Sequence, residues 1–185
     1  MIQGDTMEEK VLAILEKKGK YIAGVFTPRG LYTSSLPFDT EVEAIKDVSG
    51  LSLNREDTPT RLDALETVYG VHEGDSNAAV RDIDLDFTGF TQKQIAVLKV
   101  VMNIPFGSTM AYGEVAKKAG LPGAARFVGN VMRINRLGPV IPCHRVVSST
   151  GLGGYTGGID KKIDLLEREG VIRGEISQKA LHRMP

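Results

Sequence analysis

The sequence predicts an α/β fold for the first half of the chain and a mostly α-helical fold for the second half. The 185 residues, 42% of them hydrophobic, suffice for one or two small cores, since domains commonly have about 100–150 residues. In the first half, segments 21–26 and 31–36 flank the turn-forming run Thr-Pro-Arg-Gly at 27–30, a pattern typical of a β-hairpin. In the second half, short segments of helical spacing are separated by turns that contain glycine or proline.

Helical spacing is also present in the first half. Segment 8–18 contains a cluster of Val, Leu and Ile residues and is expected to form a short helix. Segments 38–48 and 59–69 repeat apolar residues at helical intervals. Asp57 or Thr58 is placed to cap the second of these two helices. The first half therefore combines a hairpin with helices, and it contains no recognisable chemical motif.

A polar stretch marks the expected boundary between two domains. His72 opens the run HEGDSN and is predicted to be exposed to solvent without a functional role. Segment 82–87 alternates polar and apolar residues, as in a strand or an extended linker. We therefore expect an N-terminal domain at 1–82, a C-terminal domain at 86–170 and a C-terminal tail at 171–185.

The second half has the pattern of a helix-turn-helix. Thr91 is expected to cap a helix that ends near Met102. Two further helices are expected at 112–119 and at about 124–134, joined by a Leu-Pro-Gly turn. Short helices connected in this way have the proportions of a DNA-binding helix-turn-helix. A glycine-rich loop then leads into an amphipathic helix at about 159–169.

The net charge of zero conceals two halves of opposite sign. Residues 1–85 carry nine Lys and Arg against sixteen Asp and Glu, which gives −7, and residues 86–185 carry fourteen against seven, which gives +7. A basic half favours a polyanionic partner such as nucleic acid. Attraction between the two halves of the chain would explain the same asymmetry.

Composition restricts the class of protein further. No apolar run approaches the ~18–20 residues of a membrane-spanning helix, and the N-terminal segment lacks the pattern of a secretory signal. We therefore expect a cytoplasmic protein with no membrane partner. One cysteine and three histidines exclude an internal disulfide and a cysteine-rich zinc site, so no metal is expected.

The single cysteine, Cys143, lies in the apolar run Val-Ile-Pro-Cys-His-Arg-Val-Val. A thiol with the usual pKa of about 8.5 is mostly protonated at neutral pH, so a nucleophilic cysteine needs a base or a positive environment. His144 follows directly, but adjacent side chains on a strand point to opposite faces, so a bridging water or a turn at the preceding proline is needed to connect the two. Glu169, Glu167 and Asp164 are candidates to orient the histidine. By itself, such a cysteine is more often a buried packing residue.

The heptapeptide Ile-Pro-Cys-His-Arg-Val-Val at 141–147 resembles the active-site motif of the O6-alkylguanine-DNA alkyltransferases, also called methylated-DNA–protein-cysteine methyltransferases. Further segments between about residues 86 and 170 resemble motifs of the same family, in the same order. They are Pro105-Phe106-Gly107, Ala111-Tyr112-Gly113, Ala124-Ala125-Arg126, Val128-Gly129, Met132-Arg133, Asn135, the glycine-rich run at 153–158, Lys162, Leu165-Leu166 and Glu169-Gly170. The first 80 residues share only length and position with the family.

The resemblance implies a fold and an activity. An RNase H-like α/β N-terminal domain would precede a mostly helical C-terminal domain with a winged helix-turn-helix. The implied reaction is DNA repair by direct damage reversal. An alkyl group such as methyl passes irreversibly and stoichiometrically from O6-alkylguanine in double-stranded DNA to Cys143, after the base has flipped out of the duplex. No cofactor is implied, because the lesion supplies the alkyl group, and the protein is expected to be a monomer that acts once.

The resemblance also assigns roles around the thiol. Cys143 is the nucleophile, His144 acts through a water as the base that generates the thiolate, and Glu169 orients His144. Tyr112 assists the departing guanine at N3 through its hydroxyl group. Asn135 organises the turn between the recognition helix and the active-site segment.

Two further sets of residues follow from the resemblance. Arg126 is the side chain that fills the gap left by the flipped base, and Phe127 departs from the small residue that many members carry at that position. The full DNA-binding set is Arg126, Ala124, Ala125, Gly129 and Arg133. The substrate-pocket set is Met132, Pro142, Val146, Tyr155 and Thr156.

Two alternatives belong to other classes of protein. A winged-helix regulator or lesion sensor without chemistry would explain the basic half and the helix-turn-helix, but not the Pro-Cys-His-Arg run with a matched tyrosine and glutamate. A Cys-His hydrolase would need an oxyanion hole and turnover, and it would not need a recognition helix.

Overall fold

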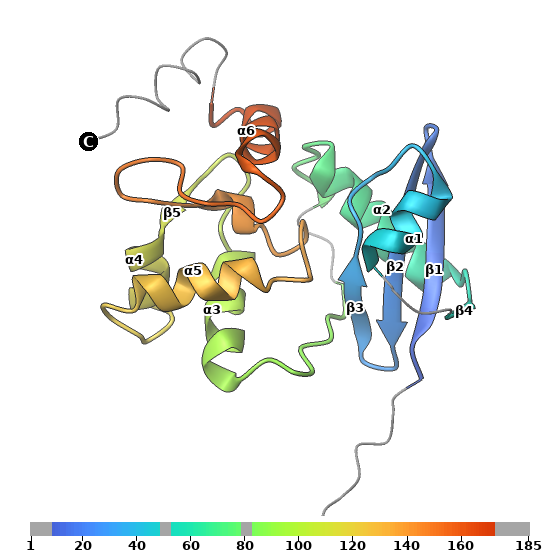
Figure 1. The fold of residues 1–185 in the computed structure, drawn as a ribbon, viewed down its shortest axis with the longest axis horizontal. Coiled ribbons are helices and arrows are strands. Elements are labelled where there is room, and N and C mark those ends of the chain that lie inside the picture. The colour runs from blue at the N-terminus through green and yellow to red at the C-terminus, as the bar shows by residue number, and fades with distance from the viewer. Residues whose placement is uncertain (1–8, 49–52, 79–82, 173–185) are drawn as a thin grey trace, which may run out of the picture.

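Two parts lie side by side in the computed structural model, which describes residues 9–48, 53–78 and 83–172 (Figure 1). We call residues 9–78 the sheet lobe and residues 83–172 the helical lobe. The described residues of the sheet lobe form a four-stranded mixed sheet with two helices, and those of the helical lobe form four α-helices and a short pair of strands. The predicted α/β first half and mostly helical second half are thereby confirmed.

The sheet has the strand order β3-β2-β1-β4. Strand β1 (Val11–Lys17) pairs antiparallel with β2 (Lys20–Thr27), and β2 pairs antiparallel with β3 (Gly30–Ser34). The short β4 (Asn54–Arg55) lies parallel to β1. The turn between β1 and β2 contains Gly19 at φ +73°, the left-handed conformation that two-residue hairpin turns require. The hairpin predicted around 27–30 is present as β2 and β3.

The helix predicted at 8–18 is wrong, because this segment contains β1. Val11 and Ala13 point into the larger apolar core of the molecule, whereas Leu12 and Ile14 point into a smaller one. All four are at most 6% exposed. A strand buried on both faces carries a continuous apolar run, and periodicity cannot distinguish such a run from a buried helix.

The two helices of the sheet lobe belong to different cores. Ala44 of α1 (Glu41–Val48) packs in the smaller core, and Leu65 of α2 (Pro59–His72) packs in the larger one. Thr58 is the N-cap of α2, as one of the two predicted alternatives, although its side chain makes no capping hydrogen bond. Burial, rather than capping, therefore stabilises α2.

The four helices of the helical lobe are α3 (Gln92–Met102), α4 (Tyr112–Lys118), α5 (Ala125–Arg133) and α6 (Ile159–Arg168). Their bounds agree with the predicted helices to within about two residues, the usual uncertainty of a helix end. Helices α3, α4 and α5 pack against one another. Among the described residues, no helix is long and apolar enough to cross a membrane.

The predicted cap of α3 is confirmed in detail. The Thr91 hydroxyl accepts a hydrogen bond from the Gln94 backbone N–H at 3.3 Å, and the Gln94 side chain accepts one from the Thr91 N–H at 2.7 Å. This capping box satisfies two backbone donors that the first turn of a helix leaves without partners. Further along, β5 (Met110–Ala111) and β6 (Val146–Val147) pair in parallel and join the start of α4 to the segment that follows Cys143.

The larger apolar core extends through both lobes. Leu65 of α2, Leu98 of α3, Val128 of α5 and Val146 of β6 are fully buried members of the same cluster. Shared burial of this kind fixes the lobes against each other. The expected domain boundary at 82 and most of the expected tail at 171–185 lie outside the described residues.

His72 is more buried than the sequence predicts. Its side chain is 16% exposed, and its Nδ1 lies 3.2 Å from Glu73 Oε1. Arg168, at the end of α6, donates to the His72 carbonyl at 3.4 Å and to Glu73 Oε1 at 3.0 Å. The expectation of a solvent-exposed histidine is wrong because α6, distant in sequence, covers the end of α2.

Candidate active site

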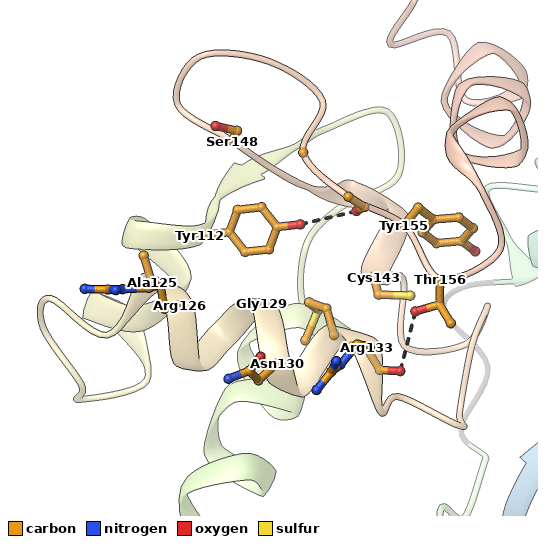
Figure 2. A pocket seen from close by; sticks show the side chains of 13 residues that line it. Tyr112, Ala125, Arg126, Gly129, Asn130, Arg133, Cys143, Ser148, Tyr155 and Thr156 are labelled. Carbon is orange, nitrogen blue, oxygen red and sulfur yellow. Dashed lines mark hydrogen bonds between the residues drawn. The ribbon is translucent and has the colours of Figure 1, made fainter.

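A pocket of about 700 Å³ opens between α5, the start of α4 and the loop that follows β6 (Figure 2). Cys143 lies at this pocket, opposite Tyr112. The lining residues are Tyr112, Ala125, Arg126, Gly129, Asn130, Met132, Arg133, Cys143, Ser148, Gly153, Gly154, Tyr155 and Thr156. The sequence resemblance names nine of them as site residues, and they come from four segments of the chain that the fold brings together.

Cys143 begins a 3₁₀ turn at Cys143–Arg145, so the apolar run is not a continuous strand. The Arg145 N–H donates to the Pro142 carbonyl at 2.9 Å and closes this turn. The sequence left open a bridging water or a turn at the proline before Cys143, and the structure contains this turn. Cys143 therefore lines the pocket, whereas the side chain of His144 is fully buried behind it.

Burial raises the pKa of the Cys143 thiol, and hydrogen bonding and charge oppose this effect. A hydrogen bond from Asn135, the positive charge of Lys162 and the backbone N–H groups of Cys143 and His144 all favour the thiolate. Asn135 also donates to the Ile141 carbonyl at 2.9 Å and accepts from the Leu137 N–H at 3.1 Å. It therefore holds the turn between α5 and the cysteine, as the resemblance implies.

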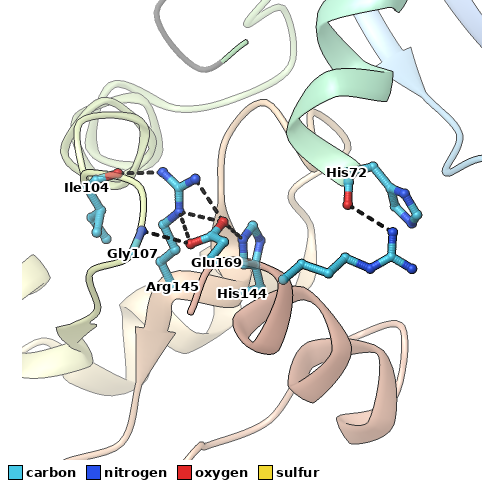
Figure 3. A network of polar contacts seen from close by, with 7 residues as sticks. His72, Ile104, Gly107, His144, Arg145 and Glu169 are labelled. Carbon is cyan, nitrogen blue, oxygen red and sulfur yellow. Dashed lines mark hydrogen bonds and ion pairs between the residues drawn. The ribbon is translucent and has the colours of Figure 1, made fainter. Parts of the chain in front are cut away.

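His144 and Glu169 form a buried pair, with 2.7 Å between Nε2 and Oε1 (Figure 3). Glu169 is the residue that follows α6, and the other two candidates, Glu167 and Asp164, are exposed on that helix. The structure thus selects one of the three carboxylates that the sequence could not distinguish. His144 Nδ1 is buried and has no hydrogen-bond partner among the described residues.

Arg145 is a member of the site whose role the sequence did not reveal. Its Nε and Nη2 donate to the Glu169 carboxylate at 2.8–3.0 Å, and its Nη1 donates to the Ile104 carbonyl at 2.6 Å. The side chain is 3% exposed. A buried charge needs a partner, so an arginine inside an apolar run was itself a signal for a buried acid.

Lys162 is a second residue whose role the sequence left unassigned. Its Nζ donates to the Val146 and Leu152 carbonyls at 2.6 Å each and is 3.4 Å from the Gly154 carbonyl. Burial lowers the pKa of Lys162 to about 8. This ammonium group ties the loop after β6 to α6 and places a positive charge near the thiol.

Tyr112, at the start of α4, and Tyr155, in the loop that follows β6, both line the pocket (Figure 2). The Tyr112 hydroxyl donates to the Gly154 carbonyl at 3.3 Å. Burial and the neighbouring Cys143 raise the pKa of both phenols. Both hydroxyl groups therefore remain protonated at neutral pH and can donate hydrogen bonds in the pocket.

Helix α5 supplies one wall of the pocket and an exposed basic rim. Arg126 and Arg133 are exposed; Ala125 directly precedes Arg126, and Gly129 lies between the two arginines along the helix. Ala124 precedes the helix as its N-cap and is not among the lining residues. Four of the five predicted DNA-binding residues are therefore brought to the pocket.

Two of the five predicted substrate residues do not line the pocket. Pro142 and Val146 are buried, and the Val146 carbonyl already accepts from Lys162. Their predicted contact with a bound substrate stays a prediction. The remaining three, Met132, Tyr155 and Thr156, line the pocket as predicted.

The described residues contain no group of three or more His, Cys, Asp or Glu side chains that could hold a metal ion.

Comparisons with known proteins relate the helical lobe to a known family. A family model described as "6-O-methylguanine DNA methyltransferase, DNA binding domain" matches residues 92–171. A methylated-DNA–protein-cysteine methyltransferase of Methanothermobacter thermautotrophicus is 51% identical over 88 residues, which are 47% of this chain and 49% of that protein. One of Mycobacterium tuberculosis is 47% identical over 89 residues, 48% of this chain and 53% of that protein. The chain thus spans about half the length of the curated relatives it matches.

Solved structures extend the similarity to both lobes. An O6-methylguanine DNA methyltransferase from Methanococcus jannaschii is 30% identical with a TM-score of 0.59, covering 88% of this chain and 95% of that one. The Mycobacterium tuberculosis protein OGT, solved in complex with DNA, is 27% identical with a TM-score of 0.68, covering 90% and 97%. The helical lobe therefore matches the DNA-binding domain of the methylguanine methyltransferases. The chain belongs to the O6-alkylguanine-DNA alkyltransferase family, the methylated-DNA–protein-cysteine methyltransferases.

Proposed function

We propose that this protein repairs DNA by transferring the alkyl group of O6-alkylguanine irreversibly to Cys143. The observation that carries this proposal is the position of Cys143 on the pocket, with His144 and Glu169 paired at 2.7 Å behind it. Catalytic cysteines need a base that is itself oriented by a third group, and this arrangement supplies both. The names of the relatives support the same reaction.

In the proposed reaction, the Cys143 sulfur forms a bond to the alkyl carbon while the bond from that carbon to guanine O6 breaks. His144 takes up the thiol proton through a water, and Glu169 stabilises the resulting imidazolium. The Tyr112 hydroxyl donates to N3 of the guanine as negative charge develops on the base. The proton that the thiol loses balances the proton that the released guanine gains. The thioether product resists hydrolysis, so each molecule acts once.

The substrate in this proposal is double-stranded DNA, bound by a monomer. Helices α4 and α5 serve as the helix-turn-helix, with α5 as the recognition helix at the minor groove. The small residues Ala125 and Gly129 permit close approach of the duplex, and Arg126 occupies the gap left by the flipped guanine. Arg133 adds a phosphate contact. The bulkier Phe127 is half-buried against the core, which supports a small-residue surface on the DNA side of α5.

The finer description of the fold belongs to the same proposal. We assign the sheet lobe to an RNase H-like domain at 1–82 and the helical lobe to a winged helix-turn-helix domain at 86–170, followed by a tail at 171–185. The mixed sheet and the packed helices α3, α4 and α5 support this division. Because the substrate is cellular DNA, we place the protein in the cytoplasm.

The test is incubation of the protein with duplex DNA that carries O6-methylguanine labelled in the methyl group. We expect label on the protein at one equivalent or less, located at Cys143 by peptide mass spectrometry, and none on Cys143→Ala. Binding of the damaged duplex without transfer would instead indicate a lesion sensor. Continued turnover beyond one equivalent would indicate a different enzyme, and loss of label from DNA with Cys143→Ala would exclude this thiol as the acceptor.

A further inference from the structure

Arg136 joins the segment before the cysteine to the sheet lobe. Its Nε donates to the Tyr32 carbonyl at 2.8 Å, and its Nη2 donates to the Asp86 and Thr88 carbonyls at 3.0 and 2.8 Å. Arg136 directly follows Asn135, the residue that holds the turn leading to Cys143. Three backbone carbonyls outside α5 and the pocket thus fix the guanidinium of one residue in this turn.

Two aromatic rings contact the same guanidinium. Its central carbon lies 4.0 Å from the centre of the Tyr32 ring and 4.3 Å from that of the Phe90 ring. The Lys10 ammonium lies 3.8 Å from the Tyr32 ring centre. Cations at these distances from ring centres are attracted by the negative ring faces. The four side chains form a linked set of cation–π contacts from the sheet lobe to the turn beside the pocket.

Strand β3 holds the backbone of this turn as well. The Thr33 hydroxyl donates to the Arg136 carbonyl, and the Ser34 hydroxyl donates to the Gly138 carbonyl, each at 3.0 Å. These two hydroxyls come from the edge strand of the sheet. The turn at 135–138 is therefore anchored through its own arginine side chain and, independently, through two of its carbonyls.

Residues of this turn are linked to the region of the thiol by a hydrogen bond and by close approach. The Ile141 N–H donates to the Leu137 carbonyl at 2.8 Å, two residues before Cys143. Gly138 approaches the thiol so closely that a Cβ atom at this position would lie 4.0 Å from Sγ. A displacement of the turn by a fraction of an ångström would thus change the surroundings of the nucleophile.

We propose that Arg136 is a positioning residue, through which the sheet lobe sets the geometry and reactivity of Cys143. The proposal deepens the function proposed above and rests on it for the alkyl-transfer readout. It gives the sheet lobe, none of whose described residues lines the pocket, a role in the reaction through the turn that it anchors. Arg136 touches no reacting atom in this scheme and acts only through Asn135 and the backbone at 137–141.

Two sets of substitutions disturb the anchor independently. Arg136→Gln removes the charge and the cation–π contacts, whereas Thr33→Val combined with Ser34→Ala removes only the two hydroxyl groups that hold the carbonyls. Arg136→Lys is the conservative variant; lysine keeps the charge but cannot donate in three fixed directions, so we expect it to restore stability more than rate. Arg61→Gln is the matched control, because Arg61, on α2 of the sheet lobe, donates to Glu56 Oε2 at 2.6 Å and to the Glu56 carbonyl at 3.2 Å.

Two readouts test the proposal: the single-turnover rate of alkyl transfer at saturating damaged duplex, and the pH dependence of the reaction of the thiol with iodoacetamide. The second is unambiguous because Cys143 is the only cysteine in the chain. We expect Arg136→Gln to lower the transfer rate at least about tenfold with a change in duplex Kd below about twofold. We also expect it to move the thiol titration upwards, and the Thr33/Ser34 pair to move both readouts in the same direction by less.

Rates and thiol titrations equal to those of Arg61→Gln in both sets of variants would overturn the proposal. The outcome separates this inference from the function on which it rests. If the wild-type protein takes no label from DNA, the proposed function fails, and the iodoacetamide profile still decides whether Arg136 controls the thiol. Should Arg136→Gln fail to fold, the Thr33/Ser34 variant tests the same anchor without removing a charge.

Discussion

The Glu169 carboxylate lies 2.7 Å from His144 Nε2 and at the same time accepts three hydrogen bonds from Arg145. One buried carboxylate thus pairs with both the permanently charged Arg145 and the titratable ring of His144. Burial, together with the Arg145 charge, lowers the pKa of His144, while Glu169 opposes this shift. The resting site therefore contains a neutral imidazole oriented by a carboxylate, which is the form that can accept the thiol proton.

Replacing Glu169 by glutamine tests this relationship. The amide has the shape of the carboxylate but leaves the Arg145 charge, 3% exposed, without a negative partner. Removing one member of a buried ion pair typically costs about 3–5 kcal/mol, so we expect a loss of that order in the free energy of unfolding. Denaturant unfolding measures the loss, and single-turnover alkyl transfer should slow in parallel because His144 loses its orienting acid.

Glu167→Gln is the matched control, since Glu167 is an exposed carboxylate on the same helix. Its free energy of unfolding should stay within about 0.5 kcal/mol of the wild type, as is usual for surface substitutions. Equal effects of the two substitutions would contradict the assignment of Glu169 as the buried partner of His144 and Arg145.

Tyr112→Phe separates the hydroxyl group from the ring. The ring keeps its contacts in the pocket, and the hydroxyl group loses only a long hydrogen bond of 3.3 Å to the Gly154 carbonyl among those of the described residues. Because a donor aimed at developing negative charge contributes about 100-fold or more, we expect the transfer rate to fall by about two orders of magnitude with little change in stability. Tyr69→Phe, in α2 of the sheet lobe, should leave the rate unchanged; an unaffected rate in Tyr112→Phe would remove the hydroxyl from the mechanism.

The parts of the fold that local signals control were predictable. Thr91 and Gln94 specify a capping box through their own side chains, and the capped helix forms where expected. The hairpin around 27–30 follows from its turn residues for the same reason. The helix wrongly predicted at β1 has a non-local cause. Val11 to Ile14 are buried on both faces of the strand by α1 and α2, and these distant helices leave no signal in the local pattern.

The residues of the site also differ in how far local sequence signals predict them. Cys143 and His144 are recognisable from a contiguous motif, but the choice of Glu169 over its neighbours depends on the exact end of α6. Arg136 and Lys162 are less predictable still, because each acts by donating to backbone carbonyls. Carbonyl acceptors are present at every residue and leave no trace in side-chain identity, so such contacts become visible only in the folded chain.

Arg126→Ala tests the contact of α5 with DNA. Arg126 is exposed at the rim of the pocket, so its removal should leave the free energy of unfolding unchanged. We expect weaker binding and slower transfer with damaged duplex, because nothing then fills the gap left by the flipped base. Transfer from free O6-methylguanine base should be unaffected, because the free base need not be flipped. Arg61→Ala in α2, which removes a charge from the sheet lobe, should change neither reaction, and equal losses with duplex and free base would contradict a role in base flipping.

Stability should decrease as the solution becomes acidic, and His144 should contribute to the decrease. Its pKa is lowered in the folded protein, mainly by burial, so below the ordinary value of about 6.5 the unfolded chain binds a proton that the folded chain does not. The stability from this group is therefore present above about pH 6.5 and is lost as pH falls towards the folded pKa, at no more than about 1.4 kcal/mol per pH unit. His72, whose pKa is also lowered by burial, acts in the same direction.

Denaturant unfolding at about pH 7.5 and pH 5.5 should show a smaller decrease in the free energy of unfolding for His144→Gln than for the wild type. A decrease of the same size in both would mean that other groups, such as His72, account for the acid sensitivity.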